Sequence, residues 1–107
     1  MYARSTYSMD TFTLTVPSVD NDGRPAPYLE KVRAGLEEAG FTGWTETACV
    51  GYWLGKFEPG TVITLYVPES KSFGVASKLA HIGRQAMPDQ EAVQVTRANL
   101  PTVLVEA

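Results

Sequence analysis

The stretch Thr61–Val67, TVITLYV in one-letter code, carries the clearest strand pattern in the chain. It consists of β-branched, aliphatic and aromatic residues, which favour extended backbone. Side chains alternate between the two faces of a strand, so one face collects apolar groups: Ile63, Leu65 and Val67. Pro68 ends the pattern because it has no N–H to donate. The stretch therefore predicts a strand with one face against a core.

On the N-terminal side, residues 10–16 alternate in the same way, with threonines between the apolar positions, and predict a second strand. Residues 27–39 have apolar groups at helical spacing, namely Leu29, Val32, Leu36 and Ala39, and Gly40 follows as a C-terminal cap. Residues 44–54 predict another strand, which Gly55 closes. Residues 56–60 are interpreted as the hairpin connection to the strand at 61–67.

On the C-terminal side, Ser70 or Ser72 is a candidate cap for a second helix that Met87 and Pro88 end. Its apolar stripe is formed by Val75, Leu79, Ile82 and Ala86. Residues 91–96 predict a further strand, and the tail at 101–105 is a candidate fifth strand.

The order strand, helix, strand, strand, helix, strand predicts an α+β, ferredoxin-like βαββαβ fold. In that arrangement two right-handed crossovers lay both helices on one face of an antiparallel sheet. The strands at 10–16 and 61–67 are expected at the centre and the strand at 44–54 at an edge. A single domain is expected over residues 1–107, with an N-terminal extension at 1–9 and the candidate fifth strand within 98–107.

The sheet face away from the helices is expected to be rich in threonine, with a few aromatic groups. Such a face suits pairing with a second copy, as in a homodimer, or a shallow platform for a flat ligand. An ordinary solvated face is the third interpretation. It is expected to present Thr11, Thr13, Thr15, Thr47, Cys49, Trp53, Thr64, Tyr66, Gln94 and Thr96.

Composition excludes several classes of function. The chain has 9 basic and 12 acidic residues, a net charge of −3, which argues against a nucleic-acid partner. A lone cysteine, Cys49, leaves no disulfide framework and no thiolate zinc site, and it favours a reducing cytoplasm. No signal peptide is seen, and no stretch approaches the ~20 apolar residues of a membrane span. No cofactor and no metal site are expected; Asp20–Gly23 is interpreted as a turn rather than a calcium loop, because Arg24 stands where a third oxygen ligand belongs.

Four short segments occur in an order that resembles a family of small, uncharacterised bacterial and phage proteins: Phe41–Thr45, Gly51–Trp53, Glu58 and Gln90–Val95. That family carries Phe-x-Gly-x-Thr, Gly-x-Trp, a following Glu and a late Gln-x-x-Val strand. The resemblance implies a compact α+β domain of the kind found in mobile-element gene sets, without an established activity. It nominates one cluster: Trp53, Glu58 and Gln90.

The candidate ligand-binding residues are Tyr52, Trp53, Phe57, Glu58 and Gln90. The aromatic groups would supply apolar contact, while the carboxylate and the carboxamide would orient a ligand by hydrogen bonds. Glu58 in plain water and Gln90 capping its own strand are the competing interpretations.

No complete catalytic set is recognised, so no catalytic residue is assigned. The leading hypothesis is a small non-enzymatic binding protein, encoded by a phage or mobile element, that sequesters a nucleotide-like ligand or inhibits a host protein. The alternative is a small dimeric ferredoxin-like enzyme that uses Glu58 or His81 as acid or base. His81 is expected on the solvent side of the second helix, and Cys49 on the other side of the sheet, which argues against a Cys/His pair. A third hypothesis is an assembly subunit that associates through its edge strands.

Overall fold

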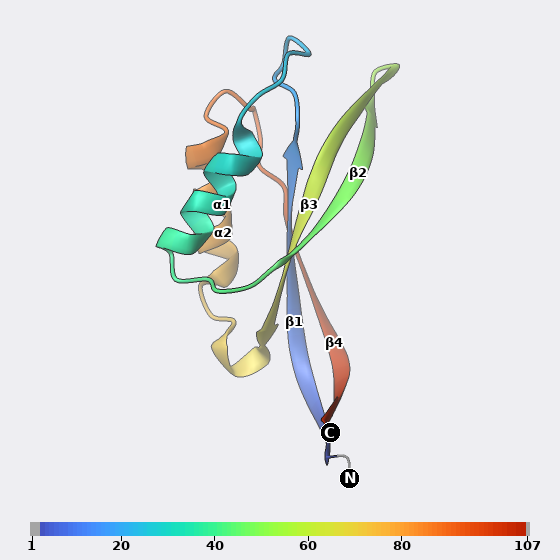
Figure 1. Ribbon diagram of the computed structural model, residues 1–107, viewed down its shortest axis with the longest axis vertical. Coiled ribbons are helices and arrows are strands. Elements are labelled where there is room, and N and C mark those ends of the chain that lie inside the picture. The colour runs from blue at the N-terminus through green and yellow to red at the C-terminus, as the bar shows by residue number, and fades with distance from the viewer. Residues whose placement is uncertain (1–2, 107) are drawn as a thin grey trace.

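The computed structural model describes residues 3–106, and the side chains of residues 8–99. Two helices pack side by side on one face of a sheet (Figure 1). The elements follow one another as β1 (Ala3–Pro17), α1 (Tyr28–Glu38), β2 (Thr45–Trp53), β3 (Lys56–Pro68), the short 3-10 helix η1 (Glu69–Lys71), α2 (Val75–Ala86) and β4 (Val95–Glu106).

The sheet has the strand order β2-β3-β1-β4, and all neighbours are antiparallel. This is the ferredoxin-like arrangement expected from the sequence, with β1 and β3 at the centre and β2 at an edge. β1 pairs with β3 over Met9–Pro17 and with β4 over Ala3–Leu14. Because the two partners overlap only in part, the β2–β3 hairpin projects beyond the helices at one end and the β1–β4 pair projects at the other (Figure 1). The molecule is accordingly long and narrow, 54 × 27 × 20 Å.

The core lies between the sheet and the helices and contains most of the predicted apolar residues. The prediction is wrong for Ala39, which is exposed because it caps the end of α1 instead of facing the sheet. Phe12, Leu14, Ile63 and Leu65 point from the sheet and are at most 2% exposed. Removal of such side chains from water contributes about 1.5–3 kcal/mol each. The helices add a larger apolar set: Tyr28, Val32 and Leu36 from α1, and Val75, Leu79, Ile82 and Ala86 from α2. The predicted stripe of α2 is thus confirmed in full.

The helix ends show one predicted cap and one correction. Gly40 has a φ of 92°, and the next amide, of Phe41, donates to the Leu36 carbonyl, which closes α1 as predicted. The prediction that Ser70 or Ser72 caps α2 is wrong, because α2 begins at Val75 after Gly74. Ser70 lies within η1, and the Ser72 hydroxyl donates to the Glu69 carbonyl instead.

Three expected boundaries also differ from the structure. Residues 3–9 of the expected N-terminal extension belong to β1, because β4 continues along this half of the strand. The tail at 101–105 is no fifth strand but the continuation of β4, which begins only at Val95 rather than at 91. Residues 56–60 are not a loop, since β3 starts at Lys56 and pairs with β2 from there. Residues 1, 2 and 107 lie outside the described residues.

A buried carboxylate fixes β4 on β1. Asp10 is 0% exposed, accepts a hydrogen bond of 2.7 Å from the Asn99 amide, and pairs with the Arg97 guanidinium at 2.6 Å. Ser72 and the Asn99 amide, together with Arg97, lower the pKa of Asp10 to about 2. Every buried polar side-chain atom among the described residues has a partner. The carboxylate therefore stays charged in the core and ties η1 and β4 to the centre of the sheet.

A second polar cluster joins β2 to α1. Arg33 donates from Nε and Nη2 to the two carboxylate oxygens of Glu46, at 2.8 and 2.5 Å, and the Trp44 indole donates to Glu46 at 2.9 Å. The Arg33 guanidinium first, and then Trp44, lower the pKa of Glu46 to about 2. This two-point pairing of a guanidinium with a carboxylate fixes the start of β2 against the helix layer. It thereby also fixes the direction of the hairpin.

The uncovered sheet face is polar but uncharged across its centre. Thr45, Thr64, Thr13 and Thr96 form one row through all four strands, and the last two hydroxyls hydrogen-bond to each other. The rows on either side are Thr47, Val62 and Thr15, and Tyr66, Thr11 and Ala98. The predicted face is therefore present, except that Gln94 precedes β4.

Candidate functional site

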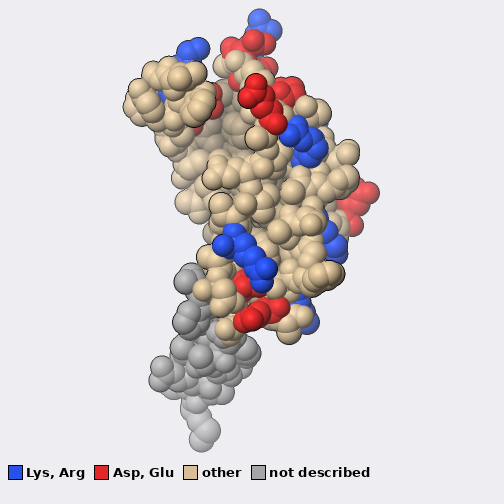
Figure 2. Space-filling view, turned by 180° about the vertical axis from the view of Figure 1, so that it is seen from behind, with Lys and Arg blue, Asp and Glu red and all other residues tan. Residues whose placement is uncertain are grey.

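At the end of the molecule where the β2–β3 hairpin projects, the hairpin and the β1–α1 loop diverge as two branches. After Pro17 the chain leaves β1, and both the amide and the hydroxyl of Ser18 donate to the Pro59 carbonyl, at 3.0 and 2.9 Å. The hairpin continues outward while the β1–α1 loop turns aside. Between them lies a hollow of about 500 Å³ that we call the fork; its lining is Val19, Asn21, Asp22 and Gly23 from the loop and Lys56, Phe57, Glu58 and Pro59 from β3. Figure 2 shows the two branches standing apart at this end of the molecule.

The loop side of the fork is stiffened by its own hydrogen bonds. Oδ1 of Asp20 accepts from the amides of Asp22 and Arg24, at 2.9 and 3.0 Å. Gly23 adopts a φ of 78°, and Val19 bridges to Pro25. The predicted turn is confirmed, and the Asp20 carboxylate serves the turn itself.

The loop is also bonded to the connection between α2 and β4. The Asn21 amide donates to the Asp89 carbonyl at 3.0 Å, and the Gln90 amide donates to the Asn21 side-chain oxygen at 3.0 Å. The Tyr28 hydroxyl donates to the Asp89 carboxylate at 2.5 Å, and this bond, together with burial, raises the pKa of Tyr28. Asn21 therefore reaches both into the fork and back to the second connection.

The structure brings some of the predicted ligand-binding residues together and separates others. Phe57 and Glu58 both line the fork. Tyr52 packs edge-on against Phe57, with ring centroids 5.1 Å apart. Gln90 does not line the hollow but is joined to it through Asn21. Trp53 lies beside the turn, paired with Lys56, and is 69% exposed.

The strand register sets the faces of these side chains. Tyr52 pairs with Phe57, so their rings share one face of the hairpin. Glu58 pairs with Gly51 and, by alternation, points to the other face from the ring pair. Glu58 is exposed, so its carboxylate is available to a ligand from solvent.

Of the lining residues, only Phe57 and Glu58 are predicted ligand-binding residues. The sequence predicts no more than a turn at Asn21 and Asp22, and no more than a hairpin at Lys56. None of these three carries a motif that points to a ligand. Their pairing depends on the branch at Pro17, where Ser18 bonds to Pro59, and that contact joins segments distant in sequence.

The candidate acid–base residues lie in different parts of the molecule. His81 is exposed on α2, at the edge of a groove between the helices, whereas Glu58 lines the fork. Cys49 shares a face of β2 with Thr45 and Thr47 by strand alternation, which is the uncovered face of the sheet. Within the described residues, no group of three or more His, Cys, Asp and Glu side chains could hold a metal ion. The lining of the fork instead includes an aromatic ring, an ammonium, two carboxylates and a carboxamide, which can contact a planar ligand by stacking and by hydrogen bonds.

Comparison with known proteins supports the fold. No protein-family model and no curated protein matches the chain. Among solved structures, it is similar to CPII, a nitrogen regulatory PII-like protein from Thiomonas intermedia K12 that was solved bound to ADP, AMP and bicarbonate. The TM-score is 0.62, and the match covers 92% of this chain and 96% of CPII at 16% sequence identity. At that identity, the likeness shows a shared ferredoxin-like fold.

No helix in the described part of the chain is long and apolar enough to span a bilayer.

Proposed function

We propose that this protein is a small, non-enzymatic binding protein that takes up a nucleotide-like ligand in the fork. The observation that carries the proposal is the fork itself: a hollow of about 500 Å³ where Phe57, Lys56 and Glu58 meet the Asn21 loop. The likeness to CPII, whose structure holds ADP and AMP, supports this ligand class, because it extends over nearly the whole of both chains.

Four of the lining residues have a part in this proposal. The Phe57 ring is 74% exposed and offers an open face on which a base can stack. Lys56 supplies a positive charge for a phosphate, and the Glu58 carboxylate and the Asn21 amide supply hydrogen bonds to ribose hydroxyls or to a base edge. A ligand that binds Asn21 would also affect the α2–β4 connection, since Asn21 is hydrogen-bonded to Asp89 and Gln90 there.

The test is calorimetric titration of the protein with ADP and with AMP. Phe57→Ala is expected to weaken binding about tenfold, because stacking of a base on an aromatic ring contributes about 1–3 kcal/mol. Lys56→Gln is expected to weaken ADP binding more than AMP binding, since ADP carries the larger charge. The matched control is Phe73→Ala, which removes a fully exposed ring outside the fork. The proposal would be contradicted if neither nucleotide bound at millimolar concentration. It would also be contradicted if Phe57→Ala and Phe73→Ala changed the affinity equally.

The enzymatic alternative is separated by Glu58→Gln. A binding protein loses affinity or nothing in this variant, whereas an enzyme that uses Glu58 for proton transfer keeps its ligand and loses turnover. Incubation of the intact protein with nucleotides and common metabolites, followed by mass spectrometry of the mixture, provides the turnover measurement. Conversion of any of them by the wild type, lost in Glu58→Gln or in His81→Gln, would favour the enzyme.

We further propose that the uncovered sheet face joins two copies of the chain as a homodimer. The three central rows of this face hold no charged residue, and charges are depleted at the centres of protein interfaces. Its threonines can hydrogen-bond across such an interface, and Tyr66, 61% exposed, supplies an aromatic group of the kind that dominates contacts.

Native mass spectrometry and sedimentation measure the copy number. The wild type is expected to be dimeric and Thr64→Arg monomeric, because the new charge lies in the middle row of the face. Thr42→Arg, in an exposed loop off the sheet, is the matched control and should remain dimeric. A wild-type monomer at ~100 μM would indicate a solvated face, and open-ended growth with concentration would indicate assembly through edge strands instead.

A second candidate function is inhibition of a host protein through the hairpin tip. Among residues 8–99, seven large apolar side chains are exposed, and five of them lie on this hairpin: Val50, Tyr52, Trp53, Leu54 and Phe57, between 64% and 83% exposed. Aromatic groups presented in this way are typical of interface hot spots. A phage or mobile-element origin, which the sequence resemblance implies, would make a host component the target. Affinity capture from host lysate should then retain one protein that a Trp53→Ser variant fails to retain and that rebinds the wild type when purified.

A further inference from the structure

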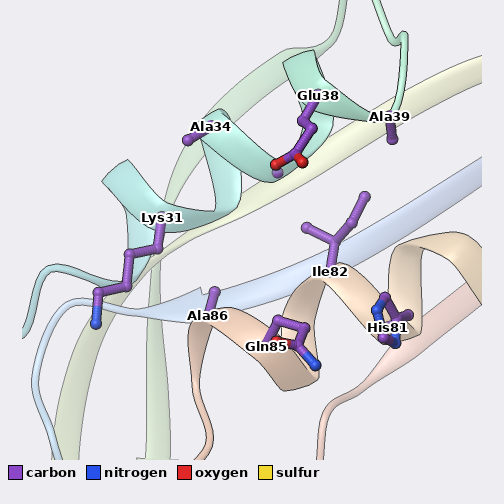
Figure 3. Close-up of a pocket in the computed structure, with 9 residues that line it drawn as sticks. Lys31, Ala34, Glu38, Ala39, His81, Ile82, Gln85 and Ala86 are labelled. Carbon is purple, nitrogen blue, oxygen red and sulfur yellow. The ribbon is translucent and has the colours of Figure 1, made fainter.

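A second hollow lies on the outer side of the helix layer, separate from the fork. It runs between α1 and α2 and has a volume of about 590 Å³. Figure 3 shows Lys31 of α1 beside the Ala86 end of α2, and Glu38 nearer His81, so the helices run antiparallel along it. We call this hollow the interhelical groove; the residues that matter below are Lys31, Ala34 and Glu38 on one wall and His81, Ile82 and Gln85 on the other.

The groove is a fixed feature of the packed fold. α1 and α2 approach so closely that a Cβ on Gly35 would lie 2.8 Å from Cγ2 of Ile82. Beneath this contact Leu36 and Leu79 are fully buried and hold the spacing of the helices. On the outer side the small Ala34 side chain leaves the space between the helices open. The hollow therefore has an apolar floor that neither helix can close without loss of core packing.

Charges of opposite sign stand at the two ends of this floor. Lys31 and Glu38 are seven residues apart, or about two helical turns and roughly 10 Å along one face of α1. The two ion pairs found among residues 8–99 are Arg33–Glu46 and Arg97–Asp10, so Lys31 and Glu38 are in neither. Figure 3 shows both side chains at opposite ends of the groove, with Gln85 and His81 along the facing wall. A molecule lying in the groove would meet an ammonium at one end and a carboxylate at the other.

We propose that the interhelical groove binds a linear, amphoteric small molecule with an apolar middle. Its acidic group would pair with Lys31 and its amine with Glu38, while its chain covers Ala34 and Ile82. The volume lies within the ~300–1,000 Å³ of small-molecule sites, and an apolar floor with a few polar groups is their usual lining. Opposite charges at the two ends select a molecule that carries both, because a ligand of one charge leaves the other end unpaired. Free peptides of a few residues and ω-amino acids share this chemistry.

The test is an amide NMR titration with 8-aminooctanoate, using octanoate and octylamine as probes that each lack one charge. The amphoteric probe is expected to bind at least tenfold more tightly than either, with shifts concentrated in α1 and α2. A tripeptide of alanine, with free termini, distinguishes a peptide from an ω-amino acid as the preferred form. Equal affinities of the amphoteric and singly charged probes, absence of binding at 20 mM, or shifts confined to other elements would overturn the proposal.

Charge reversal gives the sharper test of orientation. Lys31→Glu and Glu38→Lys, made singly, are each expected to weaken the amphoteric probe at least tenfold. The double variant is expected to recover to within about threefold of the wild type, because the ligand can bind end for end. Glu37→Lys is the matched control, since it changes the neighbouring residue, which does not line the groove, and should leave the affinity unchanged. Failure of the double variant to recover would overturn the two-ended arrangement.

Filling the groove provides a readout that does not depend on charge. Ala34 is exposed, so Ala34→Trp should occupy the floor, abolish probe binding and leave the thermal unfolding temperature within a few degrees of the wild type. ADP binding in the fork should be unchanged in the same variant. The proposed groove site and the proposed nucleotide site are therefore tested independently of each other. Undiminished probe binding by a folded Ala34→Trp protein would refute the groove as the site.

Discussion

Replacement of Leu54 by asparagine is expected to stabilise this protein, although the change removes a large apolar side chain. Leu54 and Gly55 form the two-residue turn between β2 and β3, with φ values of 48° and 82°. Two positive φ values are the mark of a type I′ turn, in which Asn-Gly is the preferred pair. The left-handed conformation costs an ordinary L-residue about 1–2 kcal/mol, a cost that asparagine largely avoids because its short polar side chain hydrogen-bonds locally.

The size of the effect follows from exposure. Leu54 is 83% exposed, so it buries about a sixth of its surface. Full burial of leucine contributes about 1.5–3 kcal/mol, and the share lost on substitution is therefore only about 0.3–0.5 kcal/mol. Relief of about 1 kcal/mol or more in the turn outweighs this loss. The free energy of unfolding should rise by about 0.5–1 kcal/mol in Leu54→Asn.

Urea unfolding followed by far-UV circular dichroism, at one protein concentration, measures the change. With an m value of about 1.5 kcal/mol/M the midpoint should rise by about 0.3–0.7 M. Leu54→Ala is the matched control, since it removes the same side chain but keeps a residue disfavoured at positive φ, and its midpoint should stay level or fall. A midpoint for Leu54→Asn as low as that of Leu54→Ala would refute the strain in the turn. A gain would show that Leu54 lowers the stability of the hairpin turn.

Three further predictions concern the fold. Leu79→Ala, which empties a fully buried position under both helices, should lower the free energy of unfolding by about 2–5 kcal/mol in the same urea titration. Gly60→Ala would place a Cβ 2.8 Å from the Val16 carbonyl oxygen, which is backbone and cannot turn away, so stability should fall by about 1–3 kcal/mol; Gly43→Ala, with nothing within 4 Å, should change little. The pKa of Asp10 is lowered from 3.8 to about 2 in the folded state, so its contribution to stability is complete above about pH 5 and is lost as the pH falls through 3.8 toward 2. Unfolding measured between about pH 5 and 2.5 should show a shallower loss in Asp10→Asn, and identical slopes would contradict this assignment.

The sequence predicted the fold class and the core because both depend on local periodicity. Alternation around Phe12 and Ile63, and the helical stripe that contains Leu79, identified side chains that are fully buried in the structure. The order of those elements then restricted the topology to the split βαβ arrangement.

Boundaries were predicted less well where long-range pairing extends a strand beyond its own pattern. Residues 3–9 show no clear alternation, yet they form half of β1 because β4 lies beside them. In the same way Lys56 and Glu58 looked like loop residues, and pairing with β2 makes them strand. Backbone hydrogen bonds to a neighbour stabilise extended chain whatever the side chains are.

The amino-acid sequence alone determined the order of the helices and strands and which of their faces are apolar, because periodicity and turn residues are local properties. Only the tertiary structure decided which polar groups meet. Asn21 reaches Gln90, and Lys31 faces the same groove as His81, through contacts between elements distant along the chain. Such contacts between polar groups depend on the angle at which loops leave the sheet and on the spacing of two packed helices. Those quantities are set by the whole core at once, so no short stretch of sequence specifies them.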